Sequence, residues 1–112
     1  MIKYPTYFVD IDGTLIKYRK FENIHHPAEP IQSVIDKVNS EYENGAHIVI
    51  TTARPETFRL LTLTELNTLG INFHQLVMGV GRGTRYVIND KDPEHPETDR
   101  AIGINLERNK GL

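Results

Sequence analysis

The sequence predicts an α/β fold with about five mostly parallel strands and helices on both faces of the sheet. Short runs rich in aromatic and β-branched residues alternate with stretches in which apolar residues recur at helical spacing. Glycines follow the ends of the helical stretches, as left-handed caps do. At 112 residues the chain can bury one core but not two. We therefore expect a single domain over residues 1–112, with no separate cap domain.

The first predicted strand runs from Lys3 to Ile11 and carries two carboxylates at its carboxyl end. Asp10 and Asp12 are two residues apart, so a strand would direct both to one face. Open α/β sheets bind their ligands at this end, and Gly13 lets the chain turn sharply there. Two like charges this close repel unless a cation lies between them or one takes a proton. The pair therefore indicates a site of chemistry.

The same D-x-D-G pattern has two other interpretations. A calcium loop would need a third oxygen ligand before the glycine and a distant Glu, and neither is present. A solvated turn would also carry such carboxylates, but the apolar run Tyr7-Phe8-Val9 leads directly into the pair.

The first strand, the helix after it and the next strand are predicted to form a βαβ unit. The second strand covers Ala46 to Thr51, and between the two strands Pro30 suits the start of a helix and Gly45 its end. The apolar positions at helical spacing are Ile31, Val34, Ile35, Val38 and Tyr42.

The remaining chain predicts a second helix, from about Pro55 to Leu69, closed by Gly70. Phe58, Leu61, Leu66 and Leu69 would face the core. Three short strands are then expected at Gln75 to Met78, Arg85 to Ile88 and Ala101 to Leu106. The link from Gly79 to Thr84 is shorter than a parallel crossover needs, so it must be an irregular loop or one strand is misassigned.

A polar segment at about residues 16–29 follows the carboxylates and is expected to form a flap over the site. It contains His25 and His26. Adjacent histidines in an extended chain point to opposite faces, so we interpret the two as solvent-exposed rather than as ligands of one metal.

Composition narrows the functions open to the chain. Without cysteine, a metal must be held by oxygen or imidazole, and carboxylates favour a hard ion such as magnesium. The net charge of −2 predicts no general nucleic-acid binding. No apolar run approaches the length of a membrane span and no leader is evident, so a cytoplasmic protein is expected. Locally, the arginines in or just after the segments beside the carboxylates favour an anionic ligand such as phosphate; these are Arg54, Arg59, Arg82 and Arg85.

Three segments resemble motifs of the haloacid dehalogenase superfamily of phosphotransferases. Asp10-Ile11-Asp12-Gly13-Thr14-Leu15 after an apolar strand resembles its first motif. Ile48-Val49-Ile50-Thr51-Thr52-Ala53-Arg54 resembles the second, and Tyr86-Val87-Ile88-Asn89-Asp90 the fourth. The resemblance implies a Rossmann-like core and hydrolysis of a phosphomonoester of unknown class with Mg²⁺.

The resemblance also implies roles for individual residues. Asp10 would attack phosphorus to form an aspartyl phosphate, and Asp12 would act as acid and then as base. Magnesium would be held by Asp10, the backbone carbonyl of Asp12 and Asp90. Thr52 would donate a hydrogen bond to the phosphoryl group, although its hydroxyl would equally suit an N-cap of the next helix. The expected substrate-binding residues are Gly13, Thr14, Ala53 and Arg54.

Two positions depart from the family pattern. No Lys lies between Lys37 and Lys91, so Arg82 or Arg85 must replace the usual catalytic Lys of the third motif, with Arg82 slightly favoured. Asn89 stands where many relatives have an acidic residue, which should weaken magnesium binding.

These observations favour a small capless phosphatase, and capless relatives often form homo-oligomers. A catalytically silent phosphate-binding or regulatory module of the same fold is the alternative, and an interaction protein that uses the flap is a third reading. The last residues, 107–111, are expected to be disordered or to line a subunit contact.

Overall fold

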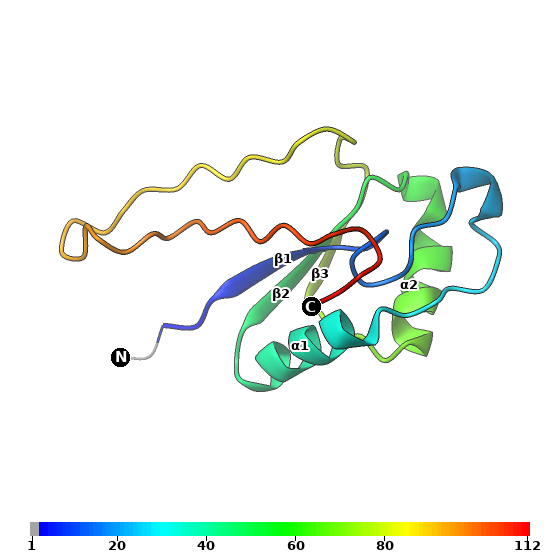
Figure 1. Cartoon of the computed structure of the whole chain (residues 1–112), viewed down its shortest axis with the longest axis horizontal. Helices are drawn as coiled ribbons and strands as arrows, with labels where there is room; N and C mark the ends of the chain where they lie inside the picture. The colour runs from blue at the N-terminus through cyan, green and yellow to red at the C-terminus, as the bar shows by residue number, and fades with distance from the viewer. Residues whose placement is uncertain (1–2) are drawn as a thin grey trace.

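The computed structural model describes residues 3–112 and contains a sheet of three parallel strands in the order β1-β2-β3 (Figure 1). β1 is Thr6–Asp10, β2 is His47–Thr51 and β3 is Gln75–Val77. Asp10 pairs with Thr51, and Thr51 pairs with Val77, so the three strands end in register. The carboxyl ends of all three strands therefore lie along one edge of the sheet.

Two α-helices connect the strands, as the sequence predicts. α1 is Gln32–Glu43 and α2 is Arg59–Thr68, and a short 3₁₀ helix at Glu56–Phe58 leads into α2. Gly45 and Gly70 have φ angles of 99° and 70°, the left-handed conformation that ends a helix most easily with glycine.

Both helices pack on the same face of the sheet, against one core. Strand alternation directs Ile48 and Ile50 of β2 to this face, where both are fully buried. Phe8 of β1 points to the opposite face and is 62% exposed. The core cluster also contains Val34, Ile35 and Val38 of α1 and Leu66 of α2.

The prediction of about five strands with helices on both faces is wrong. The described residues form three strands, and the predicted strands at Arg85 to Ile88 and Ala101 to Leu106 are extended chain without strand pairing. The link of residues 79–84 is too short to cross over the sheet, so the segment after it does not reach a parallel neighbour. Strand propensity alone does not form a strand when no partner backbone is available.

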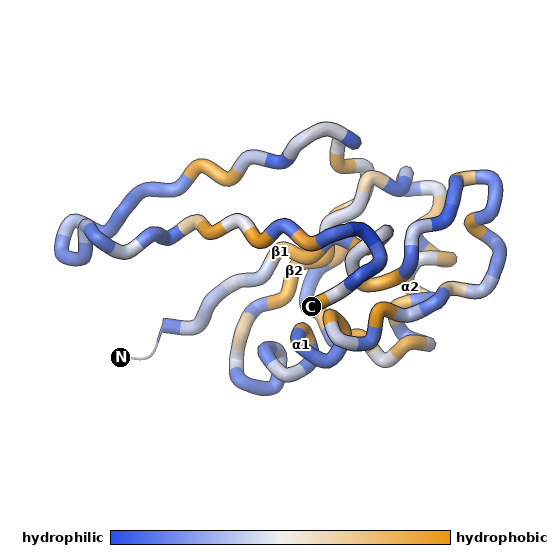
Figure 2. The backbone as a smooth tube through the Cα atoms, viewed as in Figure 1, coloured by the Kyte–Doolittle hydropathy of each residue, from blue (hydrophilic) through white to orange (hydrophobic). Residues whose placement is uncertain are grey.

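Residues 81–106, here called the arm, leave the body after β3 and return to it before the carboxyl terminus (Figure 1). Within the described chain, residues 81–91 and 99–106 form no backbone–backbone hydrogen bond. Apolar side chains on both limbs are exposed, and Ile88 reaches 96%. Figure 2 shows hydrophobic residues along both limbs. The molecule therefore measures 49 × 29 × 25 Å, longer than its compact body requires.

The flap at residues 16–29 is formed by local turns, including a 3₁₀ helix at Phe21–Asn23, and its own residue Ile24 is buried. Within residues 3–112, neither helix has the length and apolar character needed to cross a lipid bilayer.

Candidate functional site

A cavity of about 250 Å³ opens at the carboxyl ends of β1 and β2, between the flap and the root of the arm. Its position matches the edge at which parallel sheets bind ligands. The residues that line it are Asp10, Asp12, Tyr18, Arg19, Phe21, Ile24, Thr52, Ala53, Arg54, Arg82, Gly83, Arg85 and Arg108. Five arginines and two aspartates give this wall an excess of positive charge.

Asp10, the last residue of β1, is the more accessible of the two aspartates, with 35% of its side chain exposed. Arg85 Nη1 lies 3.1 Å from its Oδ1, and the Thr14 hydroxyl donates a hydrogen bond of 3.3 Å to its Oδ2. Both contacts leave Asp10 open to the cavity, so one of its oxygens can approach a bound ligand.

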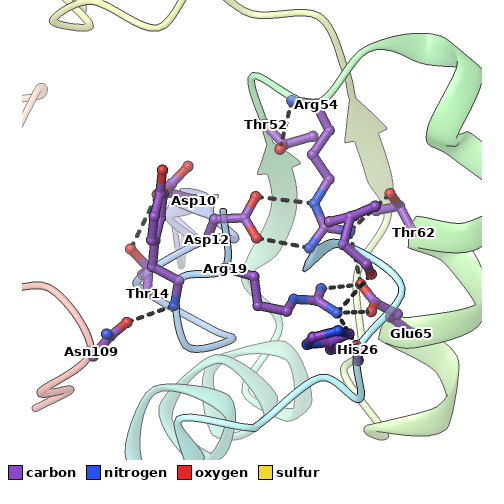
Figure 3. A network of polar contacts seen from close by, with 12 residues as sticks. Asp10, Asp12, Thr14, Arg19, His26, Thr52, Arg54, Thr62, Glu65 and Asn109 are labelled. Carbon is purple, nitrogen blue, oxygen red and sulfur yellow. Dashed lines mark hydrogen bonds and ion pairs between the residues drawn. The ribbon is translucent and has the colours of Figure 1, made fainter. Parts of the chain in front are cut away.

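Asp12 lies against Arg54, whose side chain is 5% exposed and reaches it from the loop after β2 (Figure 3). Arg54 Nε and Nη2 donate to Oδ2 and Oδ1 of Asp12 at 3.0 and 2.8 Å. This two-point contact is the strongest geometry available to an arginine and a carboxylate. Gly13 follows with a φ of 90°, which confirms the sharp turn predicted after the pair.

The ion pair extends into α2 and the flap. Arg54 Nη1 donates to Glu65 Oε1 at 2.8 Å and to the Thr62 hydroxyl at 3.1 Å. Arg19 then places Nη2 2.9 Å from Glu65 Oε1 and Nη1 2.8 Å from Oε2, and it donates to the His26 carbonyl at 2.6 Å. A chain of alternating charges thus connects the loop after β1, here called the first loop, with α2 and the flap (Figure 3).

Burial and charge act in opposite directions on Arg54. Burial lowers its pKa and is the largest single effect, but the hydrogen bonds and charges of Asp12 and Glu65 together raise the pKa above its usual value. Arg54 therefore stays ionised at neutral pH.

Thr52 is fully enclosed at the end of β2, and its hydroxyl accepts the Arg54 backbone N–H at 3.1 Å. The residue before the 3₁₀ helix is Pro55, and no side chain caps it, so Thr52 is not the N-cap of the following helix. It closes the turn that directs Arg54 toward Asp12, and Ala53 lies beside it in the cavity wall.

Arg82 and Arg85, the two candidates for the positive charge near Asp10, both line the cavity from the root of the arm. Arg85 contacts Asp10 directly, as described above. Within residues 3–112 no carboxylate lies within 4.0 Å of the Arg82 guanidinium. The geometry therefore assigns Arg85 rather than Arg82 to the aspartate.

Asp90 does not join the other two predicted metal ligands. It lies on the arm, where Arg100 Nη1 contacts its Oδ1 at 2.8 Å and Asn89 is its neighbour. No group of three His, Cys, Asp or Glu side chains suited to a metal occurs in the described part of the chain. Arg54 engages the side chain of Asp12 and not the backbone carbonyl that was the predicted ligand, so Asp90 is the predicted ligand that does not reach the cavity. The donors as placed do not form a complete magnesium site.

The flap borders the cavity, as predicted, but the predictions named none of its residues as site residues and missed the contribution of the carboxyl-terminal segment. Arg108 lies over the Tyr18 ring, 4.2 Å from its centroid, and lines the cavity. Asn109 accepts the Tyr18 N–H through Oδ1 at 2.7 Å and donates its own N–H to the Gly13 carbonyl at 2.9 Å. The polar end, residues 107–111, is therefore packed on the first loop, not disordered. The one sequence signal for this contact is that arginine and tyrosine side chains can stack. Because Arg108 and Tyr18 are 90 residues apart, that signal does not identify them as partners.

Comparisons with known proteins give a likeness of fold. No family model matches the chain, and no curated protein matches it. A crystal structure of a structural-genomics target from Vibrio cholerae matches with a TM-score of 0.57 at 20% sequence identity, covering 85% of this chain and 89% of that one. At this identity the match shows a shared fold and carries no activity.

Proposed function

We propose that the chain is a phosphomonoester hydrolase of the haloacid dehalogenase type, with Asp10 as the nucleophile. The observation that carries this proposal is the accessible Asp10 carboxylate in a cavity whose wall holds five arginines. Such a wall attracts a phosphate dianion and offsets its repulsion from the aspartate. A cavity built only to bind phosphate would have no use for an aspartate in this position.

In the first step, an Asp10 oxygen forms a bond to phosphorus while the bond to the leaving oxygen breaks, which gives an aspartyl phosphate. Water then attacks phosphorus, the bond to Asp10 breaks, and inorganic phosphate leaves. Arg85, 3.1 Å from Asp10, is placed to stabilise charge on the transferred group.

Asp12 is better suited to the second step than to the first. Its two oxygens accept hydrogen bonds from Arg54, the arrangement of a carboxylate, and one oxygen released from Arg54 would accept a proton from the attacking water. Donating a proton to a leaving group would require this contact to open. A substrate whose leaving group departs without a proton, such as p-nitrophenyl phosphate, is therefore the appropriate first assay.

Magnesium remains part of the proposal from the sequence alone. Asp10 and the backbone carbonyl of Asp12 would bind it, and Asp90, which pairs with Arg100 and does not line the cavity, argues for weak binding in this arrangement. No step above depends on the ion. Its role is tested by assaying with magnesium and with a chelator.

The test is hydrolysis of p-nitrophenyl phosphate by the unaltered chain and by Asp10→Asn. We expect the variant to lose activity by on the order of a thousandfold or more, because it lacks the attacking oxygen. Asp36→Asn is the matched control, since Asp36 is exposed on α1 and bonds only the Gln32 side chain among the described contacts. Equal turnover in the two variants would rule out Asp10 as the nucleophile.

A catalytically silent phosphate-binding module is the second candidate. The engagement of Asp12 by Arg54 and the distance of Asp90 from the cavity favour it. This function requires phosphate binding by calorimetry without turnover of any phosphate ester, whereas turnover lost in Asp10→Asn excludes it.

A further inference from the structure

We propose that the cavity accepts phosphate esters that carry a second oxyanion group, and that Arg108 binds this second group. The proposal rests on the proposed function only for the position of the first phosphate, beside Asp10. The arginines of the cavity wall differ in their partners, and this difference carries the inference.

Three of the five arginines already have acidic partners. Arg19 pairs with Glu65, Arg54 pairs with Asp12 and Glu65, and Arg85 pairs with Asp10. Arg82 and Arg108 line the same cavity, and across residues 3–112 neither has a carboxylate within 4.0 Å. The cavity therefore holds two positive charges without acidic partners, and they come from two different segments of the chain, the root of the arm and the carboxyl-terminal segment.

Arg108 is held in place by specific contacts. Its guanidinium stacks on the Tyr18 ring, an arrangement that orients the charge without neutralising it. Asn109 fixes the backbone on both sides of this stack through its bonds to Tyr18 and Gly13. A Cβ on Gly13 would lie 3.2 Å from Arg108 Cγ, so the absence of a side chain there lets the arginine approach the first loop.

The size and lining of the cavity limit the ligand. At about 250 Å³ it is smaller than the 300–1,000 Å³ typical of sites for drug-sized molecules. Tyr18, Phe21 and Ile24 of the flap give it an apolar side. A short carbon skeleton with an oxyanion at each end fits both the apolar side and the separate cations.

The test compares alkane-α,ω-bisphosphonates of two to six carbons with the matching alkylphosphonates. Neither class of ligand can be hydrolysed, because each phosphorus is bonded to carbon. Binding to the full chain is measured by calorimetry. We expect at least one bisphosphonate to bind about tenfold or more tightly than its monophosphonate, because a charge-assisted contact is added. Arg108→Gln should reduce this ratio to about twofold or less, with a much smaller loss of affinity for the monophosphonate than for the bisphosphonate.

Lys110→Gln is the matched control, because it removes the same charge from the same segment at a residue that does not line the cavity. Equal affinity of the two ligand classes for the unaltered chain would overturn the inference. So would an equal effect of the Lys110 and Arg108 substitutions, which would indicate diffuse attraction. An equal loss of affinity for the two ligand classes in Arg108→Gln would also overturn it, because Arg108 would then not act on the second group.

The two proposals fail separately. If the bisphosphonate preference depends on Arg108 but p-nitrophenyl phosphate is not hydrolysed, the second anion site stands and the hydrolase proposal falls. If hydrolysis depends on Asp10 without any bisphosphonate preference, the reverse holds.

Discussion

Arg54 shows how a single side chain connects the stability of the fold to the site. It is the one cation that contacts both Asp12 and Glu65 among the described residues, and all three side chains are largely buried. Charges in such an environment are tolerated because each has a partner with hydrogen bonds. Removing the arginine would leave Asp12 without a counter-charge, whereas Glu65 would keep its pair with Arg19.

We expect Arg54→Met to lower the free energy of unfolding by about 3 kcal/mol, because an uncompensated buried charge is costly. Arg59→Met is the control. Arg59 pairs with the exposed Glu56, so its loss should change stability much less. Urea unfolding of both variants provides the measurement. Adding Asp12→Asn to Arg54→Met should recover part of the loss, and strictly additive effects would show that the two residues are not coupled.

At the scale of elements, Arg19 links the flap to α2 through its ion pair with Glu65. Its guanidinium contacts Glu65 and the carbonyls of Ile24 and His26, although its Nε is buried without a partner in the described structure. The flap therefore carries a tether of its own, separate from the backbone turns.

Arg19→Met should loosen the flap without unfolding the body. The amides of Asn23, Ile24 and His26 are hydrogen-bonded within the flap, and we expect them to exchange with deuterium faster in this variant. Lys17→Met is the control, because the Lys17–Glu29 pair is exposed. Unchanged exchange at these three amides in Arg19→Met would contradict the tether.

Sequence patterns predicted elements whose signals are local. The helix predicted from Ile31 and Gly45, and the strands that end at Asp10 and Thr51, are all present with small shifts at their ends. The same patterns failed for residues 85–88 and 101–106, because strand formation depends on a partner that local sequence does not specify.

The candidate site, like the fold, could be predicted from the sequence where its contacts depend on short-range patterns. The turn after Asp10 and Asp12 and the nearby Arg54 follow from short-range patterns, and the structure brings them together. The partnership of Arg54 with Glu65, and the position of Arg108 over Tyr18, depend on how distant segments pack. Asp90 was assigned to the site from its place after an expected strand, and without that strand it lies elsewhere.

At the scale of the whole molecule, the arm and the body differ in how their backbones are bonded. The body has a hydrogen-bonded sheet, whereas the two limbs of the arm are linked to it mainly by side-chain ion pairs such as Arg85–Asp10 and Lys3–Asp92. Exposed ion pairs of this kind contribute little and weaken with salt.

We therefore expect hydrogen exchange to divide the chain sharply. Amides at residues 85–91 and 99–106 should exchange at nearly the rate of an unfolded peptide, because no backbone acceptor protects them in the described structure. Amides of β2, which is paired on both sides, should be protected by orders of magnitude more. Peptide-resolved mass spectrometry distinguishes the two regions. Strong protection of residues 85–91 that disappears on dilution would instead mean that the arm pairs with another copy of the chain, and protection that persists on dilution would mean that it pairs with its own body.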